Sequence, residues 1–399
     1  MLRQIALMIL LLCLAVTGEA QLRYLPQPEP TDSITISLLT CAPGAEVYQL
    51  EGHSGLRMQY GENDLVANWG VFDFDSPGFA YRFCKGETDY MIAVYPLASF
   101  LIPYNVEGRR VTCQRLALTR AEAAKVLELV DRNLLPENRV YRYNYVLDNC
   151  ATRPVAIIEQ AVADSIRFNT PYLELGDTPT FRSVMSHFHS YYPWYQFSID
   201  LALGSGVDQE IDTRLTMFAP AVLCRMMATA TVGNRPIVDQ TTILIQGNEQ
   251  GTPLAPTPWY LTPLTAASLI CFITLVLVGV SISTRRLFKG WYALLFTVQA
   301  IGGLILTFLC FISVHEATSP NILLFWLNPL CLLVPALIFS ERGRKWLTPY
   351  MWANLLMCLV PLIGAIFGAQ VLNAAFYPLI FTDILLSANY ILFSRDSNR

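Results

Sequence analysis

Residues 251–284 read GTPLAPTPWYLTPLTAASLICFITLVLVGVSIST, and this stretch divides the chain into two parts of different composition. Its first eight residues are rich in Pro, Thr and Gly, which is typical of a linker between domains. From Trp259 onward the sequence is almost continuously apolar, and a helix needs about 20 such residues to cross a bilayer. The stretch therefore predicts a linker at 251–258 and a membrane domain at 259–399.

Four more apolar segments follow the first, and together they predict an all-α transmembrane domain with five helices. The predicted spans are 259–283, 291–314, 322–340, 350–370 and 376–393. Asn328 and Pro329 lie inside the third span and are expected to kink it. Asp383 lies inside the fifth span, where an acid is either a functional group or a hydrogen-bonding partner of a neighbouring helix.

Basic residues occur in alternate connections between the predicted spans. They follow the first, third and fifth spans, as Arg285, Arg286, Lys289, Arg342, Arg344, Lys345, Arg395 and Arg399. The connections after the second and fourth spans contain no Lys or Arg. By the positive-inside rule the basic connections and the C-terminus are cytoplasmic. The part of the chain before the first span is therefore expected in the periplasm, and the protein in the inner membrane.

The N-terminus and the composition agree with export of the first half of the chain. Arg3, a short apolar run, and the small residues Gly18 and Ala20 predict a signal peptide at 1–20, which leaves an exported domain at 21–250. Hydrophobic residues make up 53% of the chain and charged residues only 15%. This composition excludes a disordered chain and an ordinary soluble protein. With a net charge of −4 and no basic stripe, no nucleic-acid partner is expected.

The exported domain contains an odd number of cysteines. These are Cys41, Cys84, Cys113, Cys150 and Cys224. In an oxidising compartment, an odd count leaves at least one thiol outside any intramolecular disulfide. The sequence alone leaves the pairing of the others open.

Histidine is scarce, so the candidates for acid–base chemistry are few. Alternating apolar residues on both sides of Gly61–Asp64 predict a β-hairpin with His53 on its first strand and Asn68, Trp69 and Asp73 on its second. His187 and His189 form a His-x-His pair after a predicted helix, but no suitable third ligand is close in sequence. No metal or other cofactor is therefore expected.

Cys150 lies at the predicted start of a helix. Asp148 and Asn149 are typical capping residues, Pro154 suits the first turn, and the apolar residues after it have helical spacing. A thiol at a helix N-terminus is stabilised as the thiolate, and a nearby imidazolium lowers its pKa further. This placement suits a cysteine nucleophile, although a lone cysteine is also compatible with a buried structural thiol or a half-cystine.

Four segments carry a resemblance to a known family. They are HSGLR (53–57), NWGVFDFDSPGFAYRFCKGETDY (68–90), EGRRV (107–111) and YRYNYVLDNCATR (141–153). The region of about 30–230 resembles the exported domain of the Lnb-type lipoprotein N-acyltransferases, membrane enzymes of Bacteroidota. The order of a histidine first and an Asn-Cys pair later is also similar to circularly permuted papain-like cysteine enzymes. The resemblance implies an α+β exported domain of permuted papain-like fold.

The resemblance also implies roles for individual residues. It makes Cys150 the nucleophile and His53 the base. Counting about the turn places Asn68 on the same face as His53, which favours Asn68 as the residue that orients the imidazole. Asp73 is the alternative, with an orienting role or a structural role in the following loop. The expected lipid- or oxyanion-binding residues are Arg57, Arg82 and Asn149.

The expected reaction moves an acyl chain from a phospholipid to Cys150 and then to the N-terminal amine of a diacylglyceryl lipoprotein. Two alternatives stay open at this point. One is a membrane-anchored cysteine peptidase or peptidoglycan amidase with the same dyad. The other is a non-catalytic envelope assembly or sensor module in which Cys150 is held in a disulfide.

Overall fold

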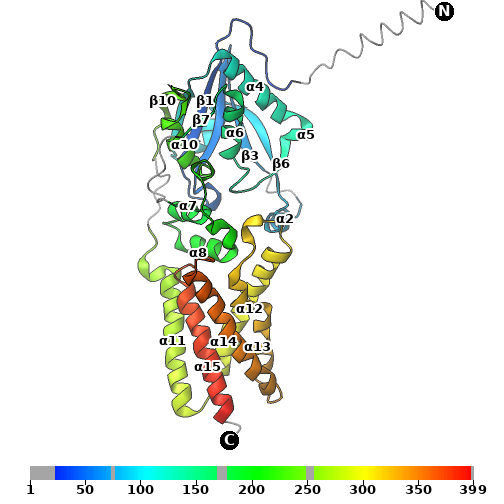
Figure 1. Cartoon of the computed structure of the whole chain (residues 1–399), viewed down its shortest axis with the longest axis vertical. Helices are drawn as coiled ribbons and strands as arrows, with labels where there is room; N and C mark the ends of the chain where they lie inside the picture. The colour runs from blue at the N-terminus through cyan, green and yellow to red at the C-terminus, as the bar shows by residue number, and fades with distance from the viewer. Residues whose placement is uncertain (1–22, 73–76, 169–177, 249–255, 397–399) are drawn as a thin grey trace, which may run out of the picture.

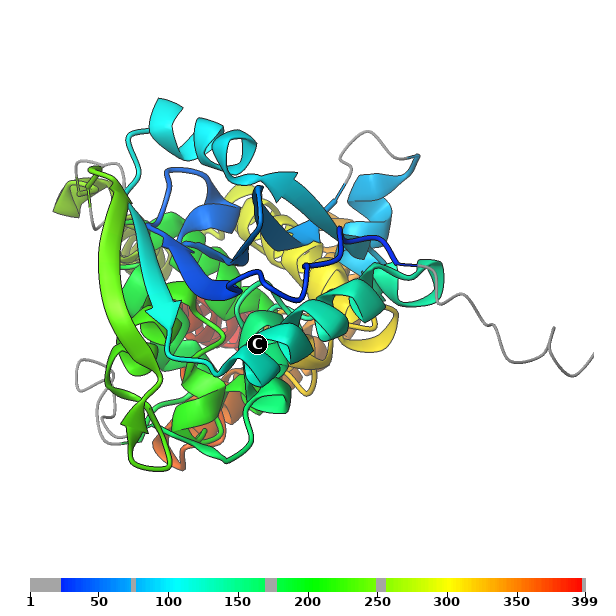
Figure 2. The same cartoon turned by 90° about the horizontal axis from the view of Figure 1, so that it is seen from above.

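The computed structural model describes residues 23–72, 77–168, 178–248 and 256–396. The predicted signal peptide, most of the predicted linker and Asp73 lie outside the described residues. A domain containing a β-sheet sits on one end of a helical bundle (Figure 1), and in the view along the long axis the membrane helices lie behind this domain (Figure 2). The α+β domain followed by an all-α domain agrees with the prediction.

A seven-stranded antiparallel sheet forms the centre of the N-terminal domain, in the spatial order β10-β5-β1-β2-β3-β4-β6. The strands are β1 Thr35–Cys41, β2 His53–Tyr60, β3 Asn63–Val71, β4 Asp89–Pro96, β5 Val111–Leu116, β6 Val140–Arg142 and β10 Val238–Ile245. The predicted hairpin is confirmed, because β2 and β3 pair from Tyr60 and Asn63. Gly61 turns the chain there with a φ of 51°, a conformation that favours glycine.

Helices cover both faces of the sheet. Successive strand residues point to opposite faces, so the neighbours Leu38 and Leu39 belong to two different hydrophobic clusters. On the face of Leu38 lie α4 (Arg120–Leu134), α6 (Thr152–Ala161) and α10 (Pro220–Thr229). On the face of Leu39, α3 (Leu97–Val106) contributes Phe100 and Tyr104 beside the start of β2. The sheet therefore carries a hydrophobic layer on each face.

Short elements complete the domain. They are η1 Val47–Gln49, α2 Phe79–Lys85, α5 Pro136–Arg139, α7 Phe181–Phe188, α8 Pro193–Ala202, η3 Ser205–Asp208, α9 Thr213–Thr216 and the small sheet of β7 Ile166–Arg167, β8 Thr231–Val232 and β9 Arg235–Pro236. Of these, α2 and the run from α7 to η3 touch the membrane domain. The N-terminal domain rests on the bundle through these two segments (Figure 1).

Four helices of the described chain are long and apolar enough to cross a membrane. They are α11 Pro263–Thr284, α12 Lys289–Phe311, α14 Arg344–Ile366 and α15 Phe376–Asp396. A short 3-10 turn, η4 Trp259–Leu261, precedes α11. The α11 helix begins at Pro263, which suits the first helical position, and the Thr262 side chain caps it. Half of the apolar window of α15 is buried, compared with 17% for α11, so α15 is the more central helix.

The third predicted span is a shorter and irregular apolar helical segment, Ile322–Leu337, rather than one long helix. The segment consists of η6 Ile322–Phe325, η7 Pro329–Leu332 and α13 Leu333–Leu337. Asn328 accepts a hydrogen bond from the Leu330 backbone and so caps a new helical start, and Pro329 has no N–H to continue the previous one. The interruption is therefore a break rather than the expected kink. The segment still runs from the end of the bundle near the sheet domain to the far end (Figure 1).

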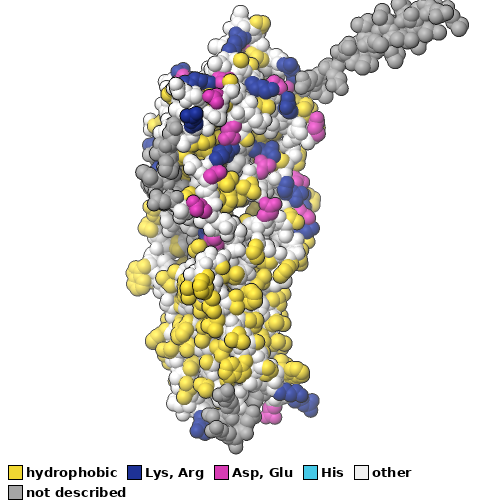
Figure 3. All heavy atoms as spheres, viewed as in Figure 1, with side chains coloured by type: hydrophobic (Ala, Val, Ile, Leu, Met, Phe, Trp, Pro, Cys, Tyr) yellow, Lys and Arg dark blue, Asp and Glu magenta, His cyan; other side chains and the backbone are white. Residues whose placement is uncertain are grey.

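The surface of the bundle is that of a membrane protein. In the space-filling view, charged side chains gather on the N-terminal domain and again at the far end, with a hydrophobic band between them (Figure 3). Phe311 and Phe367 are among the large apolar side chains of the bundle that stay exposed. An apolar band of this kind faces lipid rather than water.

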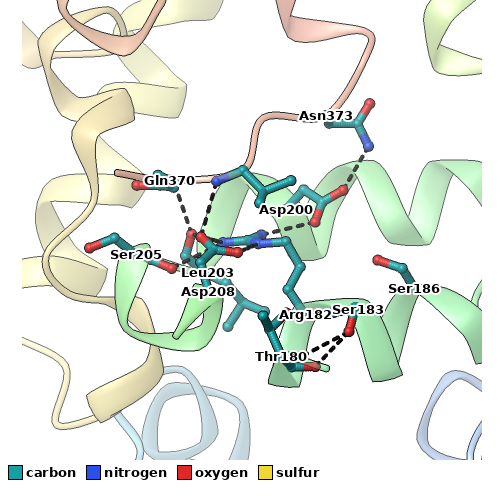
Figure 4. A network of polar contacts seen from close by, with 12 residues as sticks. Thr180, Arg182, Ser183, Ser186, Asp200, Leu203, Ser205, Asp208, Gln370 and Asn373 are labelled. Carbon is teal, nitrogen blue, oxygen red and sulfur yellow. Dashed lines mark hydrogen bonds and ion pairs between the residues drawn. The ribbon is translucent and has the colours of Figure 1, made fainter. Parts of the chain in front are cut away.

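A buried ion-pair network joins the N-terminal domain to the bundle (Figure 4). Arg182 of α7 lies 2.9 Å from Asp200 of α8 and 2.6 Å from Asp208 of η3. Asp200 also accepts a hydrogen bond from Asn373, which precedes α15, and Asp208 accepts one from the Val371 backbone. Each carboxylate is therefore bonded both to Arg182 and to the chain between α14 and α15.

A second contact between the domains surrounds this network. Gln370 donates to the carbonyl of Leu203, and Asn321 donates to the carbonyl of Leu201. Gly204 lies so close to the bundle that a Cβ there would be 2.3 Å from the carbonyl oxygen of Pro320. The backbone of the bundle and that of the segment from α7 to η3 are thus in direct contact.

Candidate functional site

His53 is the first residue of β2, and Asn68 of β3 holds its ring. The strand register places Leu56 opposite Ala67, so Asn68 comes opposite Gly55 and on the face of His53. The His53 Nε2 atom lies 2.6 Å from the Asn68 Oδ1 atom. An amide oxygen only accepts, so Nε2 carries the proton and Nδ1 is the nitrogen left to accept. The predicted side-chain facing of Asn68 matches this geometry.

Cys150 lies just before α6, in a loop that side chains hold from several directions. The Asn149 side chain accepts hydrogen bonds from the backbone N–H groups of Ala151 and Thr152, as the capping pattern predicts. Asp148 and Arg153 form a bidentate ion pair of 2.5 and 2.7 Å across the same turn. The position of the Cys150 backbone is therefore set by its neighbours on both sides.

The thiol of Cys150 meets His53 at the start of the central strand β2, where the two side chains share a hydrogen bond. Gly70 lies beside them with a φ of 91°, which favours glycine. A Cβ at Gly70 would be 3.8 Å from the Cβ of Cys150 and 3.6 Å from the Tyr143 ring. These are ordinary contact distances, so the positive φ rather than a lack of space is what favours glycine at this position.

Two further residues hold the thiol, and the sequence pattern did not identify them. Ser54 donates its hydroxyl to the Cys150 carbonyl at 2.6 Å, and its backbone N–H bonds to the sulfur. Tyr143 donates its hydroxyl to the sulfur as well. Ser54 follows His53 directly and Tyr143 lies within the same motif as Cys150, so proximity in the chain was the available signal.

The charges of the pair stabilise each other. Burial alone would raise the pKa of the Cys150 thiol, but the His53 imidazolium and the bonds from His53, Ser54 and Tyr143 together lower it below its usual value. Burial alone would lower the pKa of His53, but the Cys150 thiolate and the bonds to Cys150 and Asn68 raise it. Burial also raises the pKa of Tyr143 well above its usual value, so this hydroxyl keeps its proton.

The opposite side of His53 is closed by α3 and β1. The rings of His53 and Phe100 lie 6.4 Å apart. Cys41 is the cross-strand neighbour of His53, and burial raises the pKa of its thiol to about 12. Of the two buried thiols beside this imidazole, Cys150 ionises far more readily than Cys41. Only Cys150 is therefore suited to act as a nucleophile.

Arg57 and Asn149, two of the predicted lipid- or oxyanion-binding residues, have partners within the protein. Arg57 stands four residues along β2 from His53, about 13 Å at strand spacing, and its guanidinium forms a bidentate ion pair with Asp64. Asn149 donates both amide protons to the carbonyls of Tyr145 and Phe218. Asn149 is thus a buried structural residue. Arg82 lies on α2 beside the bundle, and Asp73 is outside the described residues.

The cysteines of the described residues form no disulfide. Cys150 is a thiol rather than a half-cystine, so the alternative that places it in a disulfide is wrong. Cys84 is exposed on α2.

The other histidines have structural partners. His189 lies 2.8 Å from Glu51 and 2.9 Å from Gln196, in a buried cluster between the start of β2 and α8. His315 contacts the carbonyl of Phe83 at 2.9 Å. Among the described residues no group of three or more His, Cys, Asp or Glu is placed to hold a metal. In the bundle, Asp383 accepts hydrogen bonds from Gln299 and Trp326. This agrees with the expectation that the acid pairs with a neighbouring segment of the bundle.

The site faces the membrane domain. Glu51 precedes β2 and bonds through His189 to the α7–α8 corner, which rests on the bundle. At the same sheet end, β3 leads to α2, whose Lys85 carbonyl accepts a hydrogen bond from the Val314 backbone at the end of α12. The Cys150–His53 pair thus lies at the end of the sheet nearest the bundle, at the start of the central strand β2.

Comparison with known proteins agrees with this architecture. The model of the Lnb N-terminal periplasmic domain matches residues 27–186, and the model of the Lnb transmembrane domain matches residues 255–397. No curated protein and no solved structure matches the chain. The two models describe the two domains of one family and together span most of the sequence, in the order seen in the structure. The chain therefore belongs to the Lnb family, as a membrane protein with a periplasmic N-terminal domain.

Proposed function

We propose that the protein is a lipoprotein N-acyltransferase that uses Cys150 as its nucleophile. The observation that carries this proposal is the hydrogen-bonded Cys150–His53 pair at the end of the central strand β2 that is nearest the membrane bundle. Membership of the Lnb family supports a role in lipoprotein processing. The donor is a phospholipid, and the acceptor is the N-terminal amine of a diacylglyceryl lipoprotein.

In the first half-reaction the Cys150 thiolate attacks an ester carbonyl carbon of the phospholipid. The tetrahedral intermediate carries its negative charge on the former carbonyl oxygen. The backbone N–H of Cys150, at the start of α6, is the proposed donor to that oxygen. The C–O ester bond then breaks, and the His53 imidazolium gives its proton to the departing lysophospholipid oxygen. The product on the enzyme is an acyl thioester.

In the second half-reaction the lipoprotein amine attacks the thioester carbonyl carbon. The now neutral His53 takes a proton from the attacking nitrogen, and the C–S bond breaks. The products are an amide and the restored thiolate–imidazolium pair. Asn68 acts as a positioning residue, because its oxygen holds Nε2–H and leaves Nδ1 toward the thiol.

The membrane location suits both substrates, whose acyl chains reside in a leaflet. Full extraction of a long acyl chain into water costs on the order of 10 kcal/mol, at about 0.8 kcal/mol for each methylene. A site seated directly on the bundle avoids this cost. The basic residues around the far end of the bundle support a cytoplasmic C-terminus in the inner membrane.

The test is the lipid state of a lipoprotein N-terminus in cells that depend on this enzyme. Cells with Cys150→Ala or His53→Ala should accumulate the free-amine diacyl form, and wild-type cells the N-acylated form. Mass analysis of the N-terminal peptide distinguishes the two. N-acylated lipoproteins in the Cys150→Ala strain would contradict the proposal, and altered cell-wall peptides in place of altered lipoproteins would favour the amidase alternative.

A further inference from the structure

Helix α2 sits at the level where the apolar surface of the bundle begins. Its C-terminal end is joined to the end of α12 by the Val314–Lys85 backbone bond of 2.8 Å and by the His315 ring on the Phe83 carbonyl. Gly86 lets this contact form, because a Cβ there would be 3.1 Å from the His315 nitrogen. Figure 1 shows α2 directly above α12. α2 is therefore held against the membrane domain rather than free beside it.

The aromatic side chains of α2 face outward at this level. Tyr81 is 59% exposed and Phe83 is 51% exposed, and the Tyr81 ring lies 6.2 Å from Phe308 of α12. Exposed aromatic rings next to a lipid-facing helix are typical of the interface between membrane and water. The outer end of α2 is thus placed where acyl chains begin.

A continuous series of ring contacts leads from α2 to the thiol, and we call its five members the aromatic ladder. Phe83 stacks on Phe79 at 5.9 Å, and Phe79 stacks on Phe72 at 5.7 Å. Phe72 lies 4.8 Å from Tyr90, and Tyr90 stacks on Tyr143 at 4.3 Å. Tyr143 bonds to the sulfur of Cys150. The ladder therefore connects the membrane surface with the proposed nucleophile.

The ladder is not an ordinary buried core. Tyr90 is buried, Tyr143, Phe72 and Phe79 are half-buried, and Phe83 is exposed, so the open end of the ladder lies on α2. Adjoining rings that are not fully buried form an apolar strip that a ligand can cover. A half-open strip of aromatic rings that begins in lipid suits a flexible apolar chain.

We propose that the aromatic ladder is the path of the donor acyl chain, with the ester carbonyl at Cys150 and the chain tail toward Phe79 and Phe83. This inference rests on the proposed acyl transfer and adds the site that holds the chain. The ladder lets the carbonyl rise to the thiol while the tail stays on an apolar surface that continues into the bilayer. It also sets which chain lengths fill the path.

The test uses the full-length protein in vesicles of phosphatidylethanolamine and phosphatidylglycerol that contain a photoreactive phospholipid. One probe carries a diazirine near the carbonyl and a second carries it at the tail. After irradiation, the near-carbonyl probe should label the peptides of Tyr143 and Tyr90, and the tail probe those of Phe79 and Phe83. Labelling of other segments of the N-terminal domain, or the same labelling by both probes, would overturn the path.

Substitution gives a second measurement. Phe79→Ala should lower the preference for palmitoyl over octanoyl donors by about ten-fold, as expected when a large apolar contact to the longer chain is lost. Phe272→Ala removes an exposed phenylalanine ring from α11, outside the ladder, and should leave this preference unchanged. Equal chain-length profiles for wild type and Phe79→Ala would contradict the proposal.

Intact-protein mass spectrometry distinguishes a failure of the proposed acyl-chain path from a failure of the proposed acyl transfer. If the wild type forms no acyl adduct on Cys150, the acyl-transfer proposal and the path fail together. If the adduct forms but both probes label segments away from the ladder, only the path fails.

Discussion

His53 and Asn68 stand on neighbouring strands, and the 2.6 Å contact between Nε2 and Oδ1 sets which nitrogen of the imidazole faces Cys150. Both side chains lie on one face of the sheet, because Asn68 comes opposite Gly55, two residues along β2 from His53. A ring held in this way cannot rotate without losing its partner, so the orientation of His53 is part of the fold rather than of substrate binding.

Asn68→Ala should slow acylation of Cys150 by about 10²-fold, the loss typical of a misplaced catalytic group. The variant keeps both Cys150 and His53, so the defect is expected in kcat more than in KM. Steady-state kinetics with a thioester donor measure both kcat and KM. Asn68→Gln is the comparison, and a fully active Asn68→Ala variant would remove Asn68 from the mechanism.

The pH dependence of the reaction follows from the two shifted pKa values. Acyl transfer should increase as pH rises through the lowered pKa of Cys150, since the thiolate is the nucleophile. It should decrease as pH rises through the raised pKa of His53, since the imidazolium protonates the leaving oxygen. The expected profile is a bell between these values.

The rate at which iodoacetamide alkylates Cys150 reports the ionisation of its thiol alone, which sets the low-pH side of the expected profile. In His53→Ala the counter-charge is gone while burial stays, so the alkylation midpoint should move to higher pH, toward or beyond the usual 9.0 of a thiol. The exposed Cys84 is an internal reference whose rate should not change. An unchanged midpoint for Cys150 would show that His53 does not stabilise the thiolate.

Arg182→Gln should separate lipid transfer from the reactivity of the thiol. The change leaves Asp200 and Asp208 buried without their cation, at a cost of about 3–5 kcal/mol to the junction. We expect phospholipid-dependent acylation to fall several-fold, while iodoacetamide still alkylates Cys150. Arg214→Gln removes a half-exposed ion pair with Glu159 in the same domain and should have little effect.

The bundle offers a matched pair of glycines. A Cβ at Gly303 would lie 2.5–2.6 Å from the backbone of Asn328, whereas one at Gly302 would lie 3.6 Å from Leu327. Gly303→Ala should therefore lower the stability of the protein in detergent by about 1–3 kcal/mol, since α12 must move away from the broken segment. Gly302→Ala should stay close to wild type. Equal thermal unfolding of the two variants would contradict this account of the contact.

Local sequence patterns predicted the features that depend on neighbouring residues. The hairpin at Gly61, the cap by Asn149 and the four long membrane helices of the described chain follow from turn residues, capping residues and apolar length. Alternation along a strand also placed Asn68 on the face of His53.

Tertiary contacts decided the rest. Arg57 reads as an exposed cation in sequence, yet its partner Asp64 becomes its neighbour only when the hairpin closes. The Asn149 amide donates both of its protons to backbone carbonyls, and one of these belongs to Phe218, which is far along the chain. The buried network of Arg182 and Asp200 depends on residues from both domains, so no window of sequence reveals it.

Intact-protein mass spectrometry after exposure to phospholipid vesicles detects the proposed acyl-enzyme itself. The wild type should gain one acyl mass, mapped to Cys150 and released by hydroxylamine as a thioester is. Cys150→Ala should gain no such mass. An acyl adduct on another residue, or N-acylated lipoprotein produced by Cys150→Ala, would contradict the proposal.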